Sequence, residues 1–207
     1  MKSTLLSLTL TLLIPIALIG CARSGETMMD DDITLADEAA IPIPVEGGTD
    51  EAMQLLGATT SENNTIVENA AAIPNLSNLV EAVQAAGLAE TLSGPGPYTV
   101  FAPTNAAFDL IDRAEFDAIM SEERRNDLAQ LLQSHVTDGE VTYGELNDGQ
   151  IVVMLSGADI QVNRDPTDEL LKQIGEADFI VYDIESSNGV IHIINLVLDP
   201  EGFFSQM

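Results

Sequence analysis

The apolar residues of this chain change their period along the sequence. Leu76 opens a series of apolar residues at positions i, i+3, i+4 and i+7, which predicts an amphipathic helix over residues 76–86. After residue 135 the apolar residues come in short runs, such as Ile151–Leu155, Phe179–Ile184 and Val190–Leu198, and these predict strands. Helices that come first and strands that come later are typical of an α+β fold. No internal repeat is present, so we expect one domain.

Two segments each combine a strand with a turn. Tyr98–Phe101 is a run of β-branched and aromatic residues that Pro103 interrupts, and Thr104 is placed to cap a helix that follows. Asn188 and Gly189 supply a tight turn that tolerates positive φ. The residues after this turn are almost wholly apolar, which predicts a central strand covered on both faces.

These segments, T-V-F-A-P-T-N-A-A-F over residues 99–108 and N-G-V-I-H-I-I-N-L-V-L-D-P over residues 188–200, resemble the two signature segments of the fasciclin domain. The helix that ends in a histidine at 135 resembles the family's middle segment. Ser134 stands where the family often has tyrosine, and Asn195 where it commonly has aspartate. The resemblance covers residues 63–200 and implies helices packed on a small β-sheet or β-wedge. The signature residues it implies here are structural: Phe101, Pro103, Thr104, Phe108, His135, Asn188, Gly189 and His192.

The first 20 residues have the form of a signal peptide. Lys2 gives a positive start, an apolar run follows, and a small residue precedes Cys21, the only cysteine of the chain. This pattern predicts a bacterial lipoprotein whose acylated N-terminus is Cys21, tethered to the outer membrane if the cell has two membranes. An ordinary secretory signal with an incidental cysteine is the alternative. Residues 21–62 are acidic and rich in turn formers, which predicts a flexible linker, and residues 201–207 are expected to form a C-terminal tail.

The chain is strongly acidic, with 34 Asp and Glu residues against 7 Lys and Arg, a net charge of −27. Such a surface repels phosphate backbones, so we expect no nucleic-acid partner. The charge fits a saline habitat, an ordinary acidic surface, or binding bridged by cations. In the first case the melting temperature should rise as sodium chloride is added, because salt screens repulsion within the molecule.

The sequence offers little catalytic chemistry. His135 and His192 are the two imidazoles, and both lie in apolar settings where a histidine is usually a structural residue. No G-x-S-x-G motif is present, Cys21 lies outside the domain, and two distant histidines do not make a zinc motif. We therefore predict no catalytic residue, no bound metal and no cofactor.

One acidic segment needs separate mention. Asp165, Asp168 and Glu169 could ligate a cation, but Pro166 and the short apolar pattern around Ile174 fit a surface loop with one helical turn better.

The resemblance implies two classes of function. The first is non-enzymatic adhesion or interaction with a surface protein or an extracellular polysaccharide. Asp183 and Ile184 match an Asp-Ile pair that lies in a proposed integrin-recognition segment of animal fasciclin proteins, although Ile184 also fits a core strand residue and Asp183 a turn cap. The second class is binding of an apolar small ligand, a carotenoid or a lipid, between the helix at 76–86 and the strand near Tyr98. The sequence does not identify the partner or the oligomeric state.

Overall fold

The structure is a computed structural model that describes residues 45–47, 52, 56–57, 59–164 and 171–204. The helical elements are α2 (Ile66–Ala72), η1 (Pro74–Leu76), α3 (Ser77–Ala86), α4 (Ala89–Leu92), α5 (Asn105–Asp109), α6 (Arg113–Ile119), η2 (Glu122–Arg124), α7 (Arg125–Gln133) and η3 (Tyr143–Glu145). The strands are β1 (Val45–Glu46), β2 (Tyr98–Pro103), β3 (Val136–Asp138), β4 (Ile151–Val153), β5 (Asp159–Arg164), β6 (Lys172–Ile174), β7 (Ala177–Ser186) and β8 (Gly189–Ile194). No helix of the described residues is long and apolar enough to cross a bilayer.

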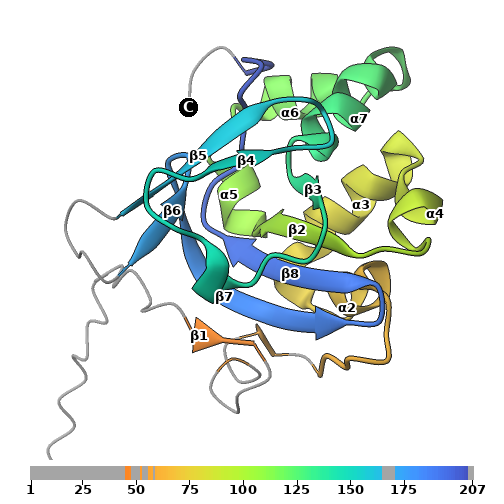
Figure 1. The fold of residues 1–207 in the computed structure, drawn as a ribbon. Coiled ribbons are helices and arrows are strands. Elements are labelled where there is room, and N and C mark those ends of the chain that lie inside the picture. Colours follow the sequence, from red (N-terminus) through yellow and green to blue (C-terminus); the bar gives the residue numbers. More distant parts are fainter. Residues whose placement is uncertain (1–44, 48–51, 53–55, 58, 165–170, 205–207) are drawn as a thin grey trace, which may run out of the picture. The chain divides into compact units, whose positions relative to one another are not determined.

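The strands form one sheet in the order β3-β2-β8-β7-β6-β5-β4, and β1 pairs with β7 beside this path (Figure 1). The two signature segments lie next to each other, because β2 runs parallel to β8 from Tyr98 opposite Gly189 to Pro103 opposite Ile194. β7 and β8 form an antiparallel hairpin whose register shifts twice between Phe179 and Ile184. These shifts mark an irregularity in β7, which we call the β7 bulge.

The central strands β2 and β8 are covered on both faces. Side chains on one face, including Val100 and Ile191, pack against α2, α3 and α7 in a first, mainly aliphatic core. Side chains on the other face, including Phe101 and Ile194, join residues of β4–β7 in a second core. Helices and the β4–β6 strands thus cover opposite sides of the central pair (Figure 1). This arrangement confirms the α+β fold and the doubly covered strand.

Local signals explain where the helices begin and end. Thr65 caps α2, since its hydroxyl accepts a hydrogen bond from the Glu68 N–H at 3.3 Å while the Glu68 carboxylate accepts one from the Thr65 N–H at 2.8 Å. The Thr104 hydroxyl caps α5 by accepting from the Ala107 N–H at 3.2 Å. Gly87 ends α3 with a φ of +74°, a conformation that costs glycine little.

The fold reaches beyond the expected bounds of 63 and 200 on both sides. Val45–Glu46 lies in the expected linker but pairs in parallel with β7, and Leu56 is only 4 % exposed in the first core. At the other end, the Asp199 carboxylate accepts hydrogen bonds from the N–H groups of Phe203 and Phe204 in the expected tail, and Phe204 is buried. The apolar residues of both segments explain the difference, because burying them in the core is favourable.

The segment expected to be a surface loop with a helical turn also differs. Lys172–Ile174 is strand β6, paired with both β5 and β7, and Ile174 is fully buried in the second core. Tertiary pairing outweighs the weak helical pattern of this short stretch. The acidic residues Asp165, Asp168 and Glu169, like Cys21 and the expected signal peptide, lie outside the described residues.

Candidate functional site around the β7 bulge

Asn188 and Gly189 join the two signature segments to the helices. The Asn188 side chain accepts a hydrogen bond from the Ile66 N–H at 2.9 Å and donates to the carbonyls of Leu92 at 2.8 Å and Gly94 at 2.9 Å. Gly189 begins β8 with a φ of +145°, and a Cβ there would lie 1.9 Å from the Tyr98 carbonyl oxygen. Glycine is therefore required by the close approach of β2 as well as by φ.

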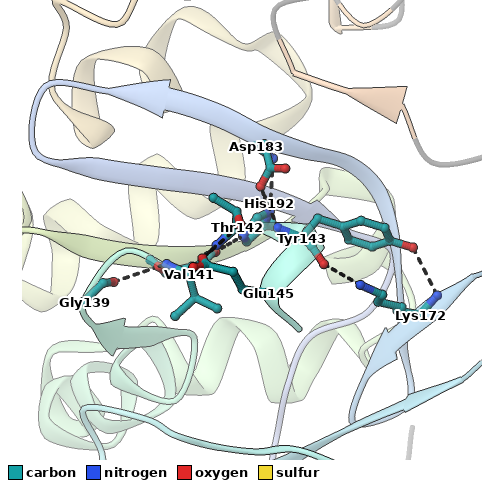
Figure 2. A network of polar contacts seen from close by, with 9 residues as sticks. Gly139, Val141, Thr142, Tyr143, Glu145, Lys172, Asp183 and His192 are labelled. Atoms are coloured by element: carbon teal, nitrogen blue, oxygen red, sulfur yellow. Dashed lines mark hydrogen bonds and ion pairs between the residues drawn. The ribbon is translucent and has the colours of Figure 1, made fainter. Parts of the chain in front are cut away.

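His192 connects the β7 bulge to the segment before η3 (Figure 2). Its Nδ1 accepts a hydrogen bond from the Asp183 N–H at 3.1 Å, and its Nε2 lies 2.8 Å from the Val141 carbonyl oxygen. This pattern assigns the proton to Nε2 and leaves the ring neutral. Burial lowers the pKa of His192 below its ordinary value, against the opposing effects of the Val141 carbonyl and the Asp183 carboxylate.

His192 also packs as an aromatic ring. It stacks on Phe101 with ring centroids 5.5 Å apart, and it meets Phe179 edge-on at 5.7 Å. Both nitrogens are engaged and the residue is fully buried, so His192 has no free position from which to act on a substrate.

His135 adopts the opposite neutral tautomer. Its Nδ1 donates to the Leu131 carbonyl at 2.8 Å, and its Nε2 accepts from the Leu198 N–H at 2.8 Å. The ring thereby ties the end of α7 to the segment after β8. Burial lowers the pKa of His135 to about 4, so the ring is neutral at physiological pH.

The remaining signature residues are structural in their placement. Phe101 and Phe108 are buried, Pro103 ends β2, and Thr104 caps α5. They bring the two segments together in the fold, and Phe108 also lines a groove along α5 and α6.

Ser134 and Asn195, the two departures from the family pattern, both form hydrogen bonds inside the domain. The Ser134 hydroxyl donates to the Gln130 carbonyl at 3.1 Å inside the protein. The Asn195 amide accepts from the Asp178 N–H at 2.8 Å and donates to the Asp178 carboxylate at 2.7 Å. An aspartate at position 195 would face that carboxylate with a second negative charge, whereas the amide complements it.

The Asp183-Ile184 pair is divided between the surface and the core. Asp183 has the positive φ of +57° that aspartate tolerates better than most residues, and its side chain is 21 % exposed. Its Oδ1 accepts a hydrogen bond from the Tyr143 N–H at 2.8 Å. Ile184 is 1 % exposed and packs in the first core. The partner-binding role of the pair stays a prediction, and of the two residues only Asp183 is exposed to a partner.

A group that the sequence did not single out lies beside Asp183. Tyr143 stacks on Tyr182 with ring centroids 4.1 Å apart, and the Lys172 ammonium lies 4.5 Å from the Tyr143 ring centroid. Lys172 Nζ also donates to the Tyr143 carbonyl (Figure 2). Burial lowers the pKa of Lys172 and raises that of Tyr182. Because these residues are far apart in the sequence, no local pattern predicts their contact.

The space between helices and sheet is small. A cavity of about 30 Å³ lies between α2, α3, α7 and β2, lined by apolar side chains and His135. It has room for little more than one water molecule. Among the described residues, no group of three or more His, Cys, Asp or Glu side chains is placed to hold a metal ion.

Comparisons with known proteins agree with this fold and with the two signature segments. The family model of the Fasciclin domain matches residues 74–200. Protein sll1483 of Synechocystis sp. is 36 % identical over 152 residues, which cover 73 % of this chain and 82 % of that protein. The cell surface glycolipoprotein MPB83 of Mycobacterium bovis is 28 % identical over 204 residues, which cover 88 % of this chain and 89 % of the relative.

A solved structure supports the fold independently. The FAS1 domain pair of the insect cell adhesion molecule Fasciclin I matches with a TM-score of 0.59 at 16 % identity, over 68 % of this chain and 52 % of that one. This chain thus spans about half of the solved domain pair. The relatives include cell-surface and adhesion proteins by their names. On the family match and the shared fold together, the chain belongs to the fasciclin domain family.

Proposed function

We propose that this chain is a non-enzymatic, lipid-anchored protein of the cell envelope that mediates adhesion by binding a surface protein or an extracellular polysaccharide. The match to a cell surface glycolipoprotein carries the proposal, because it extends over 88 % of the chain and so includes part of the sequence before residue 74. The fasciclin domain alone would not argue for an anchor. The small residue and the cysteine that close the apolar run at Cys21 supply the attachment point.

The hydrogen bonds of the two histidines support a non-enzymatic role. A general base needs a nitrogen that reaches the substrate. In both His135 and His192 one nitrogen donates to a main-chain carbonyl and the other accepts from a main-chain N–H, and neither ring is more than 1 % exposed. Burial also lowers the pKa of both rings.

The small-ligand alternative finds less support. A carotenoid or a lipid chain needs a pocket of several hundred Å³, whereas the cavity between the helices and the sheet measures about 30 Å³. Binding there would require α2 or α3 to move away from β2.

The anchor is tested by growing bacteria that express the full chain with an alkyne-bearing fatty acid. We expect the label on the wild-type protein in the membrane fraction, and neither label nor membrane retention for Cys21→Ser. A Ser24→Ala variant, three residues along the same segment, serves as the control and should keep both. Equal labelling of the wild type and Cys21→Ser would contradict the anchor.

Adhesion is tested on the same cells. Cells that display the full chain should adhere to neighbouring cells or to matrix polymers more than cells that display Gly189→Ala, in which the close contact with Tyr98 is broken. A pull-down and a glycan array with the detergent-solubilised full chain, at low and high salt, then separate protein from polysaccharide partners. If displayed wild-type protein bound neither cells nor polymers, the adhesion role would be wrong even with the anchor confirmed.

A further inference from the structure

Three exposed apolar side chains form a row on β4 and just beyond it. Ile151 is 60 % exposed, Val153 59 % and Leu155 41 %. Ile151 and Val153 flank the buried Val152 and so share one face of β4, and Leu155 follows in the turn after the strand. Single exposed apolar residues are common on protein surfaces, but a contiguous row marks a surface that gains from being covered.

A groove lies beside this row. It has a volume of about 290 Å³ and is formed by β5, the turn between β6 and β7, and the segment after β8. Its floor includes Ile160, Ala177 and Leu198, which are 6 % exposed or less. The row and the groove meet at Asp159, which lines the groove and pairs with Val153, and paired residues present their side chains on the same face. The floor residue Ile160 pairs with the buried Val152, so the floor lies on the opposite face of the β4–β5 hairpin from the row.

The groove is acidic. Asp159, Glu176 and Asp199 line it, and no lysine, arginine or histidine is among its described lining residues. Both carboxylate oxygens of Asp199 already accept main-chain hydrogen bonds from the segment that follows. Asp159 and Glu176 are exposed, so they are the carboxylates that a ligand can reach.

A second groove differs from this one in the charge of its lining residues. The groove of about 300 Å³ along α5 and α6 is also lined by acidic residues, but Arg113 stands among them and pairs with Asp117 at 3.1 Å. Glu81 and Asp109 line that groove as well, so it differs from the first in having a basic residue among its lining and not in lacking further carboxylates. The groove beside β4 leaves two exposed carboxylates above an apolar floor, an arrangement that complements a basic side chain with an aliphatic stem.

We propose that the β4 row and the adjoining acidic groove form the docking surface for a segment of a partner protein that carries apolar residues and a lysine or arginine. The apolar residues cover Ile151, Val153 and Leu155, and the basic side chain enters the groove between Asp159 and Glu176. A second copy of the chain fits poorly, because 34 acidic residues face only 7 basic ones. This inference deepens the proposed adhesion role, since it names a protein segment as the partner.

The test uses fluorescence anisotropy with the full chain in detergent and three capped, labelled peptides. They are Ile-Lys-Val-Arg-Ile, the charge-reversed Ile-Glu-Val-Glu-Ile, and the polar Ser-Lys-Ser-Arg-Ser. We expect the first peptide to bind, and the other two to bind at least about tenfold more weakly at about 0.15 M salt.

Two double variants locate the contact. Ile151→Thr with Val153→Thr removes the apolar row but keeps β-branched residues in the strand. Asp159→Asn with Glu176→Gln removes the two rim charges. Each should weaken binding of the first peptide about tenfold or more. The charge-matched control Glu90→Gln with Glu122→Gln, and Leu110→Thr as a control for a distant exposed apolar residue, should bind within about twofold of the wild type.

Several results would overturn the proposal. Equal binding of Ser-Lys-Ser-Arg-Ser would reduce it to attraction between net charges. Unchanged binding by both double variants, with folding verified by circular dichroism, would place the contact elsewhere. A wild-type dimer that the Ile151/Val153 variant abolishes would make a second copy the occupant. Cells that adhere equally well with either double variant would reject this surface and leave the adhesion role standing.

Discussion

The two faces of the central β2–β8 pair are held in different ways. On the helix face the core is mainly aliphatic, and Val100 and Ile191 pack against side chains of α2, α3 and α7, although the buried Asn69 and His135 form hydrogen bonds on this side as well. On the other face Phe101 and Phe179 surround His192, whose ring is bonded to two main-chain atoms far apart in sequence. Non-directional packing tolerates exchanges of similar volume, whereas the histidine bonds fix one register of the β7 bulge and the segment before η3.

The largest expected effect comes from a change that disturbs both faces at once. Gly189→Ala would place a methyl group 1.9 Å from the Tyr98 carbonyl oxygen, so β2 and β8 would have to separate. We expect a loss of more than about 4 kcal/mol in the free energy of unfolding, measured by urea denaturation of the full chain. Gly157→Ala is the control: its φ is +87°, but apart from its chain neighbours no described residue has an atom within 4 Å of the added Cβ, so it should cost about 1–2 kcal/mol. Similar losses in the two variants would show that φ alone matters.

A substitution confined to the second face of the β2–β8 pair separates the contribution of hydrogen bonds to stability from that of packing. His192→Phe keeps a ring between Phe101 and Phe179 but leaves the Asp183 N–H and the Val141 carbonyl without their partner. We expect it to cost about 2–4 kcal/mol in the same assay. Ile193→Val, on the helix face of the same strand, should cost about 1 kcal/mol. If His192→Phe left the free energy of unfolding unchanged, the histidine bonds would add no stability.

The pH dependence of the free energy of unfolding tests the role of the buried histidines. The pKa of His135 is about 4 in the folded protein and about 6.5 in the unfolded chain, so the unfolded state binds the proton first. His135 therefore contributes its full stability above pH 6.5, and this contribution falls by about 1.4 kcal/mol per pH unit below that value, down to pH 4.

The measurement compares wild type with His135→Gln by urea denaturation between pH 7.5 and 5.5, because the difference removes most of the change due to carboxylate protonation. The advantage of the wild type should shrink as the pH falls. A difference that is constant over this range would mean that His135 is not held neutral by burial.

The smallest expected effect concerns the helix face. Val100 lines the cavity of about 30 Å³, and Val100→Ile adds one methylene group toward it. We expect a gain of about 0.8 kcal/mol in the free energy of unfolding. Val190→Ile, at a buried site outside the cavity lining, should bring no gain. Destabilisation by Val100→Ile would show that the helix face is packed too tightly to accept volume.

The sequence predicted those parts of the fold that local patterns determine. The apolar run after Gly189, the amphipathic helix over residues 76–86 and the Thr104 cap are each encoded within a few residues. β6 was missed because Lys172–Ile174 becomes a strand only through its pairing with β5 and β7. β1 was missed for the same reason, since two residues in an acidic stretch carry no strand signal.

The candidate sites depend even more on contacts between distant residues. Asn69 is fully buried in α2 and forms hydrogen bonds with Ser61, Asn64 and the end of β7. The only sequence signal for its burial is its position on the apolar face of the helix, beside Ile66. The β4 row was visible only as a short strand, because nothing in the sequence says which of its faces is left uncovered.

The parallel pairing of β1 with β7 has a mechanical consequence. Glu46 lies opposite Tyr182, and a Cβ on Gly47 would come within 2.8 Å of the Ile184 backbone, so the incoming chain is pressed against the β7 bulge. A pull on the chain before residue 45 would load this two-residue ladder first, while β7 and β8 share a much longer one. With the anchor proposed at Cys21, the β1–β7 pairing would therefore separate first under tension, which would lengthen the connection to the membrane before β7 and β8 are loaded.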